Sequence, residues 1–277
     1  MEKSYENHFE KIRQFKIKQS QQKQRGLNDY NILTSVLSKR DEVRLHSRMI
    51  FSLLNPYGTH YQSHLFLDKF LEILNVDDFS INSKNCSVYK EYKNIDLYIT
   101  DGSKYIIIEN KIYAQDQKKQ IQRYIETIQK ENDNSLNSSD ILVIYLTLDR
   151  DTPSAYSLGN LKIEGNFVKR ESEYIALFKS IHYKKEILKW LKFCQYEVQN
   201  ITNLNEVFKQ YTDVVKMLTN QYKEKVMSLS EYIKDNESIY DMAMEIQQAL
   251  PEARKIIIDS FFEKIIDSLQ KELDDEW

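Results

Sequence analysis

The chain has 277 residues, of which 41% are hydrophobic and 29% charged, and its formal net charge is -3. This composition is ordinary for a soluble globular protein with one sizeable core. Only five glycines and three prolines are present, and no glycine-rich phosphate loop, dinucleotide-binding turn or Gly-x-Ser-x-Gly elbow occurs. ATP hydrolysis, NAD chemistry and lipase-type catalysis are therefore not expected.

The cellular compartment is indicated by the cysteines and by the N-terminus. Cys86 and Cys194 are far apart and lack metal-type spacing, so a disulfide framework or structural zinc is not expected, and a reducing cytosol is the default. There is no signal-peptide pattern and no apolar run that could span a bilayer. We expect a cytoplasmic protein without a membrane anchor.

The first part of the chain reads as helical. Residues 11–25 contain six lysines and arginines and no acid, a pattern that fits either a solvated helix face or a nucleic-acid contact. Further helices are predicted over 30–37, 42–54 and 64–74, where apolar residues recur at helical spacing. The turn residues at 55–58 end the second of these helices.

Three strands are predicted next, over residues 85–91, 95–100 and 104–112. Asp101-Gly102-Ser103 is a turn signal, so the second and third strands read as a hairpin. If the loop is residues 101–104, Thr100 pairs with Tyr105.

The same register places acidic residues together. Asp96 then lies opposite Glu109, and Lys111 shares the face of Glu109 because a strand repeats every two residues. Two adjacent carboxylates repel each other unless a divalent cation lies between them. The pattern predicts metal-assisted attack of water on a phosphodiester, although solvated strand-end charges are the alternative reading.

The remaining elements are a helix over 115–129, a polar loop over 131–140 and a strand over 141–148. This last run is almost continuously apolar, which is typical of a strand buried on both faces. An exposed loop follows from residue 151, and Tyr174 to Ile181 is predicted to be an edge strand. From residue 184 onward the pattern is helical, with the last helix starting near Pro251.

Two further features concern partners. A basic cluster, Lys118, Lys119 and Arg123, follows the Glu-x-Lys triplet directly and is expected to contact nucleic acid. The last helix has an apolar stripe over residues 258–273, which indicates intrachain packing or a homodimer interface. The acidic end of the chain, Asp274-Asp275-Glu276, has no assigned role.

With this order of elements, the chain resembles the PD-(D/E)XK nuclease superfamily over roughly residues 30–220. That superfamily carries an acidic residue on its second strand and Glu-x-Lys on its third, which match Asp96, Glu109 and Lys111. Ile95 replaces the proline in the superfamily's name. Residues 41–60 resemble the opening helix of a bacterial branch with a Glu-x-x-x-His-Ser pattern, and residues 120–124 match the Gln-x-x-x-Tyr motif of exonuclease-like members.

The resemblance implies an α/β, restriction-endonuclease-like fold. Its αβββαβ core has a mixed central sheet flanked by helices, and a helical C-terminal region is added here. The expected organisation is a basic helical segment over 1–28, the nuclease core over 29–200 and the C-terminal helices over 201–277.

The resemblance and the hairpin register assign the same metal ligands. Asp96, Glu109 and the backbone carbonyl of Asn110 would hold Mg²⁺ or Mn²⁺. Lys111 would hold the attacking water and stabilise developing negative charge, and it is a poor general base unless its pKa is strongly depressed.

The resemblance extends the site to two helices. Glu42 would complete the metal shell through a water or bind a second cation, although it could be a surface charge paired with Arg44. His46 shares its helix face and reads as a packed, hydrogen-bonded residue rather than a zinc ligand. Gln120 would donate to a phosphate or a metal-bound water. Tyr124 would contact nucleic acid or belong to the core.

The expected activity is Mg²⁺-dependent cleavage of nucleic acid, with DNA favoured over RNA, in defence against foreign DNA or in DNA repair. RNA cleavage is one alternative, and a catalytically silent nucleic-acid-binding or partner-regulated module is another. The intact Asp96, Glu109 and Lys111 argue against the silent module.

Overall fold

The computed structural model describes residues 2–275. The chain forms two compact units, one of residues 30–222 and one made of the segments before and after it. The helix over Thr202–Leu218, α8, lies within the first unit. None of the described helices is long and apolar enough to cross a membrane.

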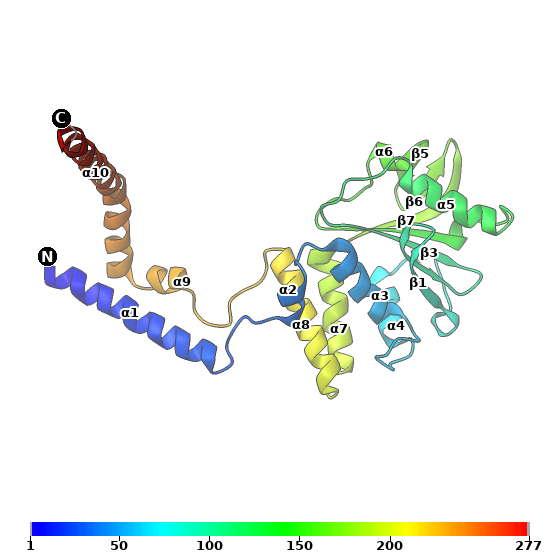
Figure 1. Ribbon diagram of the computed structural model, residues 1–277. Coiled ribbons are helices and arrows are strands. Elements are labelled where there is room, and N and C mark those ends of the chain that lie inside the picture. The colour runs from blue at the N-terminus through cyan, green and yellow to red at the C-terminus, as the bar shows by residue number, and fades with distance from the viewer. Residues whose placement is uncertain (1, 276–277) are drawn as a thin grey trace. The chain divides into compact units, whose positions relative to one another are not determined.

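The larger unit is built on one mixed sheet of seven strands in the order β1-β2-β3-β4-β7-β6-β5 (Figure 1). β3 pairs parallel with β4, and β4 with β7, whereas every other pairing is antiparallel. The strands are β1 (Ser87–Tyr92), β2 (Ile95–Thr100), β3 (Tyr105–Lys111), β4 (Ile141–Thr147), β5 (Leu161–Glu164), β6 (Phe167–Arg170) and β7 (Glu173–His182).

Helices cover both faces of this sheet. One face packs against α3, α4, α7 and α8 in the larger apolar core, and the other packs against α5 and α6 (Figure 1). The helical elements are α2 (Ile32–Val36), η1 (Glu42–Ser47), α3 (Arg48–Leu54), α4 (Leu65–Leu74), η2 (Ser83–Asn85), α5 (Gln120–Glu131), η3 (Ser138–Asp140), α6 (Ala155–Leu158), η4 (Tyr183–Ile187), α7 (Leu188–Glu197) and α8 (Thr202–Leu218).

The centre of the sheet is buried on both sides. Every residue of β3 and β4 is buried, and successive residues alternate between the two cores: Ile106 and Ile108 face the larger core, and Ile107 faces the smaller. The restriction-endonuclease-like α/β architecture expected from the sequence is confirmed.

The predicted hairpin register is correct. Thr100 pairs with Tyr105, and Leu97 with Ile108, so continuing the register places Asp96 opposite Glu109. The loop holds because the Asp101 carboxylate accepts hydrogen bonds from the backbone N–H groups of residues 103 and 104, each at 2.9 Å.

The prediction of an edge strand at Tyr174–Ile181 is wrong. β7 lies inside the sheet, between β4 and β6, because a hairpin of β5 and β6 covers its outer side. The sequence contained a signal for this hairpin in Gly165-Asn166, a pair that favours a two-residue turn. Gly165 has a φ of +59° there.

Two predicted helix starts are also wrong. α5 begins at Gln120 rather than residue 115, because Asp116 is bound to a neighbouring loop and Lys119 has a left-handed φ of +52°. α10 spans Glu237–Asp275 with Pro251 inside it. Its N-terminal turns are held by packing of the buried Ile239 and Met242, although a proline removes one helical hydrogen bond.

The smaller unit consists of α1 (Glu2–Gln24), α9 (Leu229–Lys234) and α10. Phe15 of α1 stacks on Tyr232 of α9 with ring centroids 4.1 Å apart, and the Gln19 amide donates to the Met227 carbonyl at 2.7 Å. Of the six basic residues over 11–25, all but Arg25 lie on α1, and most of them are exposed.

Candidate active site

The three residues of the predicted carboxylate and lysine pattern lie together where β2 begins and β3 ends. Asp96 Oδ2 accepts a hydrogen bond from the backbone N–H of Asn110 at 2.9 Å. Lys111 Nζ lies 2.6 Å from Glu109 Oε1. The side chain of Glu109 is fully buried, and that of Lys111 is 5% exposed.

Glu109 is a buried carboxylate whose close contact is the ammonium of Lys111. Lys111 approaches it as an ion pair, but neither carboxylate oxygen receives a hydrogen bond of normal geometry. The neighbouring Tyr124 hydroxyl gives its proton to the Asn94 carbonyl instead. Asp96 and Glu109 share the charge of one cation, Lys111, so a second positive charge is needed to compensate both carboxylates.

The pKa values follow from this burial. Loss of hydration, and then the charge of Asp96, raise the pKa of Glu109 to about 8. Loss of hydration raises the pKa of Asp96 to about 6, against the opposing hydrogen bond from Asn110. Burial lowers the pKa of Lys111, but the charge and hydrogen bond of Glu109 together with the charges of Asp96 and Glu42 outweigh it, and the net pKa is raised. Lys111 is therefore an ammonium at neutral pH.

Asn110 connects the site to the far face of the sheet. Its side-chain amide donates to Ser47 Oγ at 3.0 Å and accepts from the Tyr183 hydroxyl at 2.8 Å. Its backbone N–H points to Asp96, and in a strand the carbonyl of a residue points to the same side as its N–H. The Asn110 carbonyl is thus directed to the side where Asp96 lies.

These groups fit a hard divalent cation. Among the described residues, no three His, Cys, Asp or Glu side chains gather as a metal-binding group. The donors here are two carboxylates and one carbonyl, all oxygen, which is the chemistry that Mg²⁺ and Mn²⁺ prefer. The buried oxygens of Glu109, which lack donors, are the observation that fits such an ion.

Glu42 reaches the site from a π-helical turn, η1. The turn is defined by the bond from the His46 N–H to the Asp41 carbonyl, at 3.2 Å, and the Asp41 side chain caps it through the Arg44 N–H at 2.8 Å. Glu42 Oε2 accepts the backbone N–H of Ile112 at 2.6 Å. Glu42 is therefore held by the backbone of the residue that follows Lys111, rather than paired with Arg44.

His46 is a packed residue in the core. Its Nε2 lies 2.9 Å from the Lys39 carbonyl and its Nδ1 lies 3.1 Å from the Tyr211 hydroxyl. Since a carbonyl only accepts, Nε2 carries the proton and Nδ1 accepts from Tyr211. Burial lowers the pKa of His46 to about 4, so the ring is neutral and both nitrogens are engaged. This agrees with the packed reading rather than a zinc ligand.

Gln120 and Tyr124 support the site from α5. They are 3% and 2% exposed. The Gln120 amide donates to the Tyr124 hydroxyl at 2.8 Å, and its carbonyl accepts the Gln117 N–H at 3.2 Å. Tyr124 in turn donates to the Asn94 carbonyl. Its burial leaves no open ring face on which a base could stack, so this placement favours a packing role.

The basic cluster lies at the start of α5. Lys118, Lys119 and Arg123 are exposed, and the Arg123 guanidinium donates to the Lys118 carbonyl at 3.0 Å. The cluster therefore presents positive charge close to the helix that carries Gln120 and Tyr124.

Asp116 connects two loops near the site, and the sequence did not indicate this role. The Asp116 carboxylate accepts from the Tyr145 hydroxyl at 3.1 Å and from the Ser154 N–H at 2.7 Å. It joins the loop after β3 to the loop after β4, on the same side of the sheet as Lys111. No local pattern marks such a role, because both partners are distant in sequence.

A mixed sheet with a carboxylate pair and a lysine at the ends of two adjacent strands defines a restriction-endonuclease-like α/β protein. A comparison with protein families agrees: the model of the PD-(D/E)XK nuclease superfamily matches residues 28–213, and the chain belongs to that superfamily. No curated protein and no solved structure shows a significant match to the chain.

Proposed function

We propose that this protein is a Mg²⁺-dependent nuclease that hydrolyses phosphodiester bonds of DNA in the cytoplasm. The observation that carries the proposal is the buried carboxylate of Glu109, which lacks hydrogen-bond donors and lies between Asp96 and Lys111. Membership of the nuclease superfamily supports it. By analogy of fold, its role would be defence against foreign DNA or DNA repair.

Asp96, Glu109 and the Asn110 carbonyl would hold the ion, either Mg²⁺ or Mn²⁺. When bound, the ion lowers the pKa of a coordinated water and neutralises charge on the phosphate. Lys111, an ammonium at neutral pH, cannot act as a general base. It donates hydrogen bonds to the attacking water or to a phosphate oxygen and stabilises the charge that develops there.

Two side chains orient these groups. Glu42 commits one oxygen to the Ile112 N–H, which leaves its other oxygen for a water beside the cation. Gln120 holds the Tyr124 hydroxyl in place, and this hydroxyl lies beside Glu109. Lys118, Lys119 and Arg123 would contact backbone phosphates.

The test is cleavage of linear, circular and single-stranded DNA and of RNA, with Mg²⁺, Mn²⁺ or EDTA. We expect metal-dependent cutting of DNA that falls by about 100- to 1,000-fold in Lys111→Ala and is lost in Asp96→Asn. Lys162→Ala is the matched control, because Lys162 is exposed on β5 at the far edge of the sheet.

Other outcomes select the alternatives. Cutting of RNA alone would identify a ribonuclease. Tight binding of nucleic acid without cutting by the wild type would support the catalytically silent or partner-regulated module. Cutting that survives in both site variants would exclude this site as the active one.

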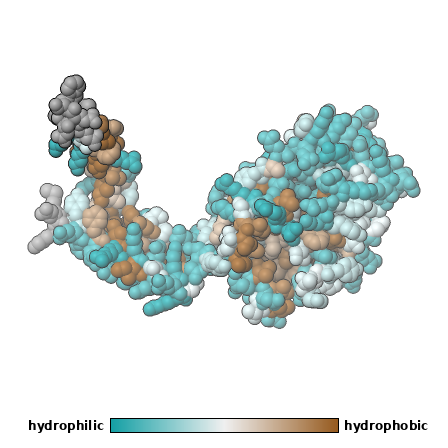
Figure 2. All heavy atoms as spheres, viewed as in Figure 1, coloured by the Kyte–Doolittle hydropathy of each residue, from teal (hydrophilic) through white to brown (hydrophobic). Residues whose placement is uncertain are grey.

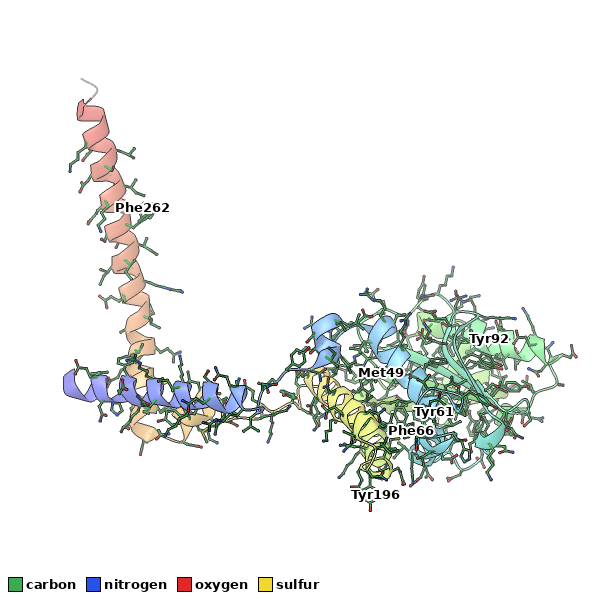
Figure 3. All side chains as sticks on the ribbon, turned by 60° about the horizontal axis from the view of Figure 1, so that its bottom comes forward. Met49, Tyr61, Phe66, Tyr92, Tyr196 and Phe262 are labelled. Atoms are coloured by element: carbon green, nitrogen blue, oxygen red, sulfur yellow. The ribbon has the colours of Figure 1, made fainter. Side chains whose placement is uncertain are left out.

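We also propose that the protein forms a homodimer through α10. Between residues 256 and 269, this helix carries eight large apolar side chains that are 38% to 68% exposed, and Phe262 projects from it into open space (Figures 2 and 3). These side chains offer on the order of 600 Å² per copy, close to the roughly 800 Å² per partner of a standard interface. Monomers rarely expose so large an apolar patch.

A further inference from the structure

A second feature adjoins the site on the segment that leaves β3. Two residues after Lys111, the ring of Tyr113 is 57% exposed. The guanidinium carbon of Arg40 lies 5.2 Å from the centre of this ring. The hydrogen bond between Glu42 and the Ile112 N–H joins the two segments, so Arg40 and Tyr113 lie beside the metal-binding groups.

Among the described residues, the Arg40 guanidinium has no carboxylate partner and the Tyr113 hydroxyl has no hydrogen bond. Arg44, on the same segment, is by contrast paired with Asp41 at 2.7 Å. A planar cation and an aromatic ring, both exposed, are thus held together next to a phosphodiester-cleaving site without a structural partner.

The chemistry of the pair suits a nucleobase. Aromatic rings and guanidinium planes stack on the π-face that every base has, and the guanidinium also hydrogen-bonds phosphate. In a duplex the faces of the bases are covered by their neighbours, and only the edges are accessible. A base that stacks on Tyr113 must therefore be unstacked and unpaired.

We propose that Arg40 and Tyr113 bind an unpaired nucleobase adjacent to the scissile phosphate. The site then selects strands that are single-stranded, frayed or locally opened at the point of cleavage. Blunt duplex enters only after it opens. This proposal rests on the nuclease function proposed above and names the form of nucleic acid that the site takes.

The test measures binding rather than cutting, with the full chain in EDTA. Fluorescence anisotropy would follow a labelled single-stranded DNA oligonucleotide, the corresponding blunt duplex and a duplex with a single-stranded overhang. We expect Tyr113→Ala to weaken binding of the single strand and the overhang about 5- to 150-fold, and to change blunt duplex binding less than twofold. Tyr113→Phe keeps the ring and should bind as the wild type does.

Arg40→Ala should act in the same direction, and Arg40→Lys should restore only part of the loss, because an ammonium does not stack as a plane. The control is Tyr57→Ala: Tyr57 is 77% exposed, and among the described residues only its backbone N–H is hydrogen-bonded, to the Asn55 side chain at 3.1 Å. Thermal unfolding of each variant confirms that it folds.

Equal weakening for single strand and duplex would reduce the pair to a phosphate contact and overturn the proposal, as would unchanged binding by Tyr113→Ala. The two proposals fail separately. If the wild type cuts in a metal-dependent way but Tyr113→Ala binds as the wild type does, only the proposal of a base-binding site fails. If Tyr113→Ala selectively loses single-strand binding but the wild type never cuts, only the proposed catalytic function fails.

Discussion

The energetics of the site are set by where individual charged atoms are buried. Glu109 has both carboxylate oxygens enclosed and faces Asp96, so its pKa is raised, whereas the pKa of Asp96 is raised mainly by its own loss of hydration. The pairing of these two residues follows from the hairpin turn and could be predicted from the sequence. Their burial could not, because it depends on α5 and the loop after β4, whose contacts are distant in sequence.

At the same scale, one buried histidine makes the stability of the protein depend on pH. His46 is buried between the Lys39 carbonyl, Tyr211 and the ring of Tyr183, with the carboxylate of Asp41 as its nearest charge. Burial lowers its pKa to about 4 in the folded state, whereas an unfolded histidine has a pKa of about 6.5. Between these values the unfolded chain binds the proton, so stability is lost as the pH falls below 6.5.

We expect the difference in unfolding free energy between wild type and His46→Gln to reveal the contribution of His46 protonation. Between pH 7 and pH 5, wild type should lose about 2 kcal/mol that the variant does not lose. Glutamine can still donate to Lys39 and accept from Tyr211, and Asp96 and Glu109 titrate in both proteins. Denaturant unfolding in EDTA at several pH values gives the comparison, and parallel curves would show that His46 does not titrate on unfolding.

At the scale of elements, local signals were reliable where a turn and an apolar run agreed. The Asp101 turn fixed the register of β2 and β3, and the apolar run of β4 marked a central strand. The hairpin of β5 and β6 was missed because each strand is only four residues long and half of those residues are charged. The start of α5 was misplaced because a distant hydrogen bond to Ser154 holds Asp116 in a loop.

The short helix η4 anchors the end of β3 from the side of the larger core. Its Tyr183 is fully buried and donates to Asn110 Oδ1 at 2.8 Å. In Tyr183→Phe this buried oxygen loses its donor, so we expect a loss of about 1 to 3 kcal/mol in unfolding free energy and weaker metal-dependent stabilisation. Tyr196→Phe is the control, because Tyr196 is 71% exposed on the adjoining α7. Equal stability of the two variants, measured by denaturant unfolding, would mean that the hydrogen bond contributes nothing.

At the scale of the whole molecule, the sequence predicted the superfamily and the order of the core elements but not the extent of α10. Proline is common at the start of a helix, which placed the beginning of the last helix at Pro251. The residues upstream continue the helix because two of them are buried in the smaller unit. The result is a long helix whose residues 247–271 are exposed throughout.

A helix of this length with one apolar side is not stable alone in water, because helix formation in proteins depends on packing of the amphipathic face. A second copy of α10 would provide that packing symmetrically, so each substitution acts twice. Phe262→Glu removes two buried rings from the interface, which we expect to cost about 3 to 6 kcal/mol of association free energy. Glu263→Gln, about 100° around the same helix from Phe262, keeps the shape of the side chain and should leave the dimer intact.

Size-exclusion chromatography with light scattering on the full chain distinguishes these states. We expect twice the chain mass for wild type and for Glu263→Gln. We expect a single chain mass for Phe262→Glu, with a reduced helical circular dichroism signal because α10 has lost its packing partner. A wild type that stays monomeric at high concentration would show that the stripe is covered within its own chain. A dimer that survives in Phe262→Glu would place the interface on another surface.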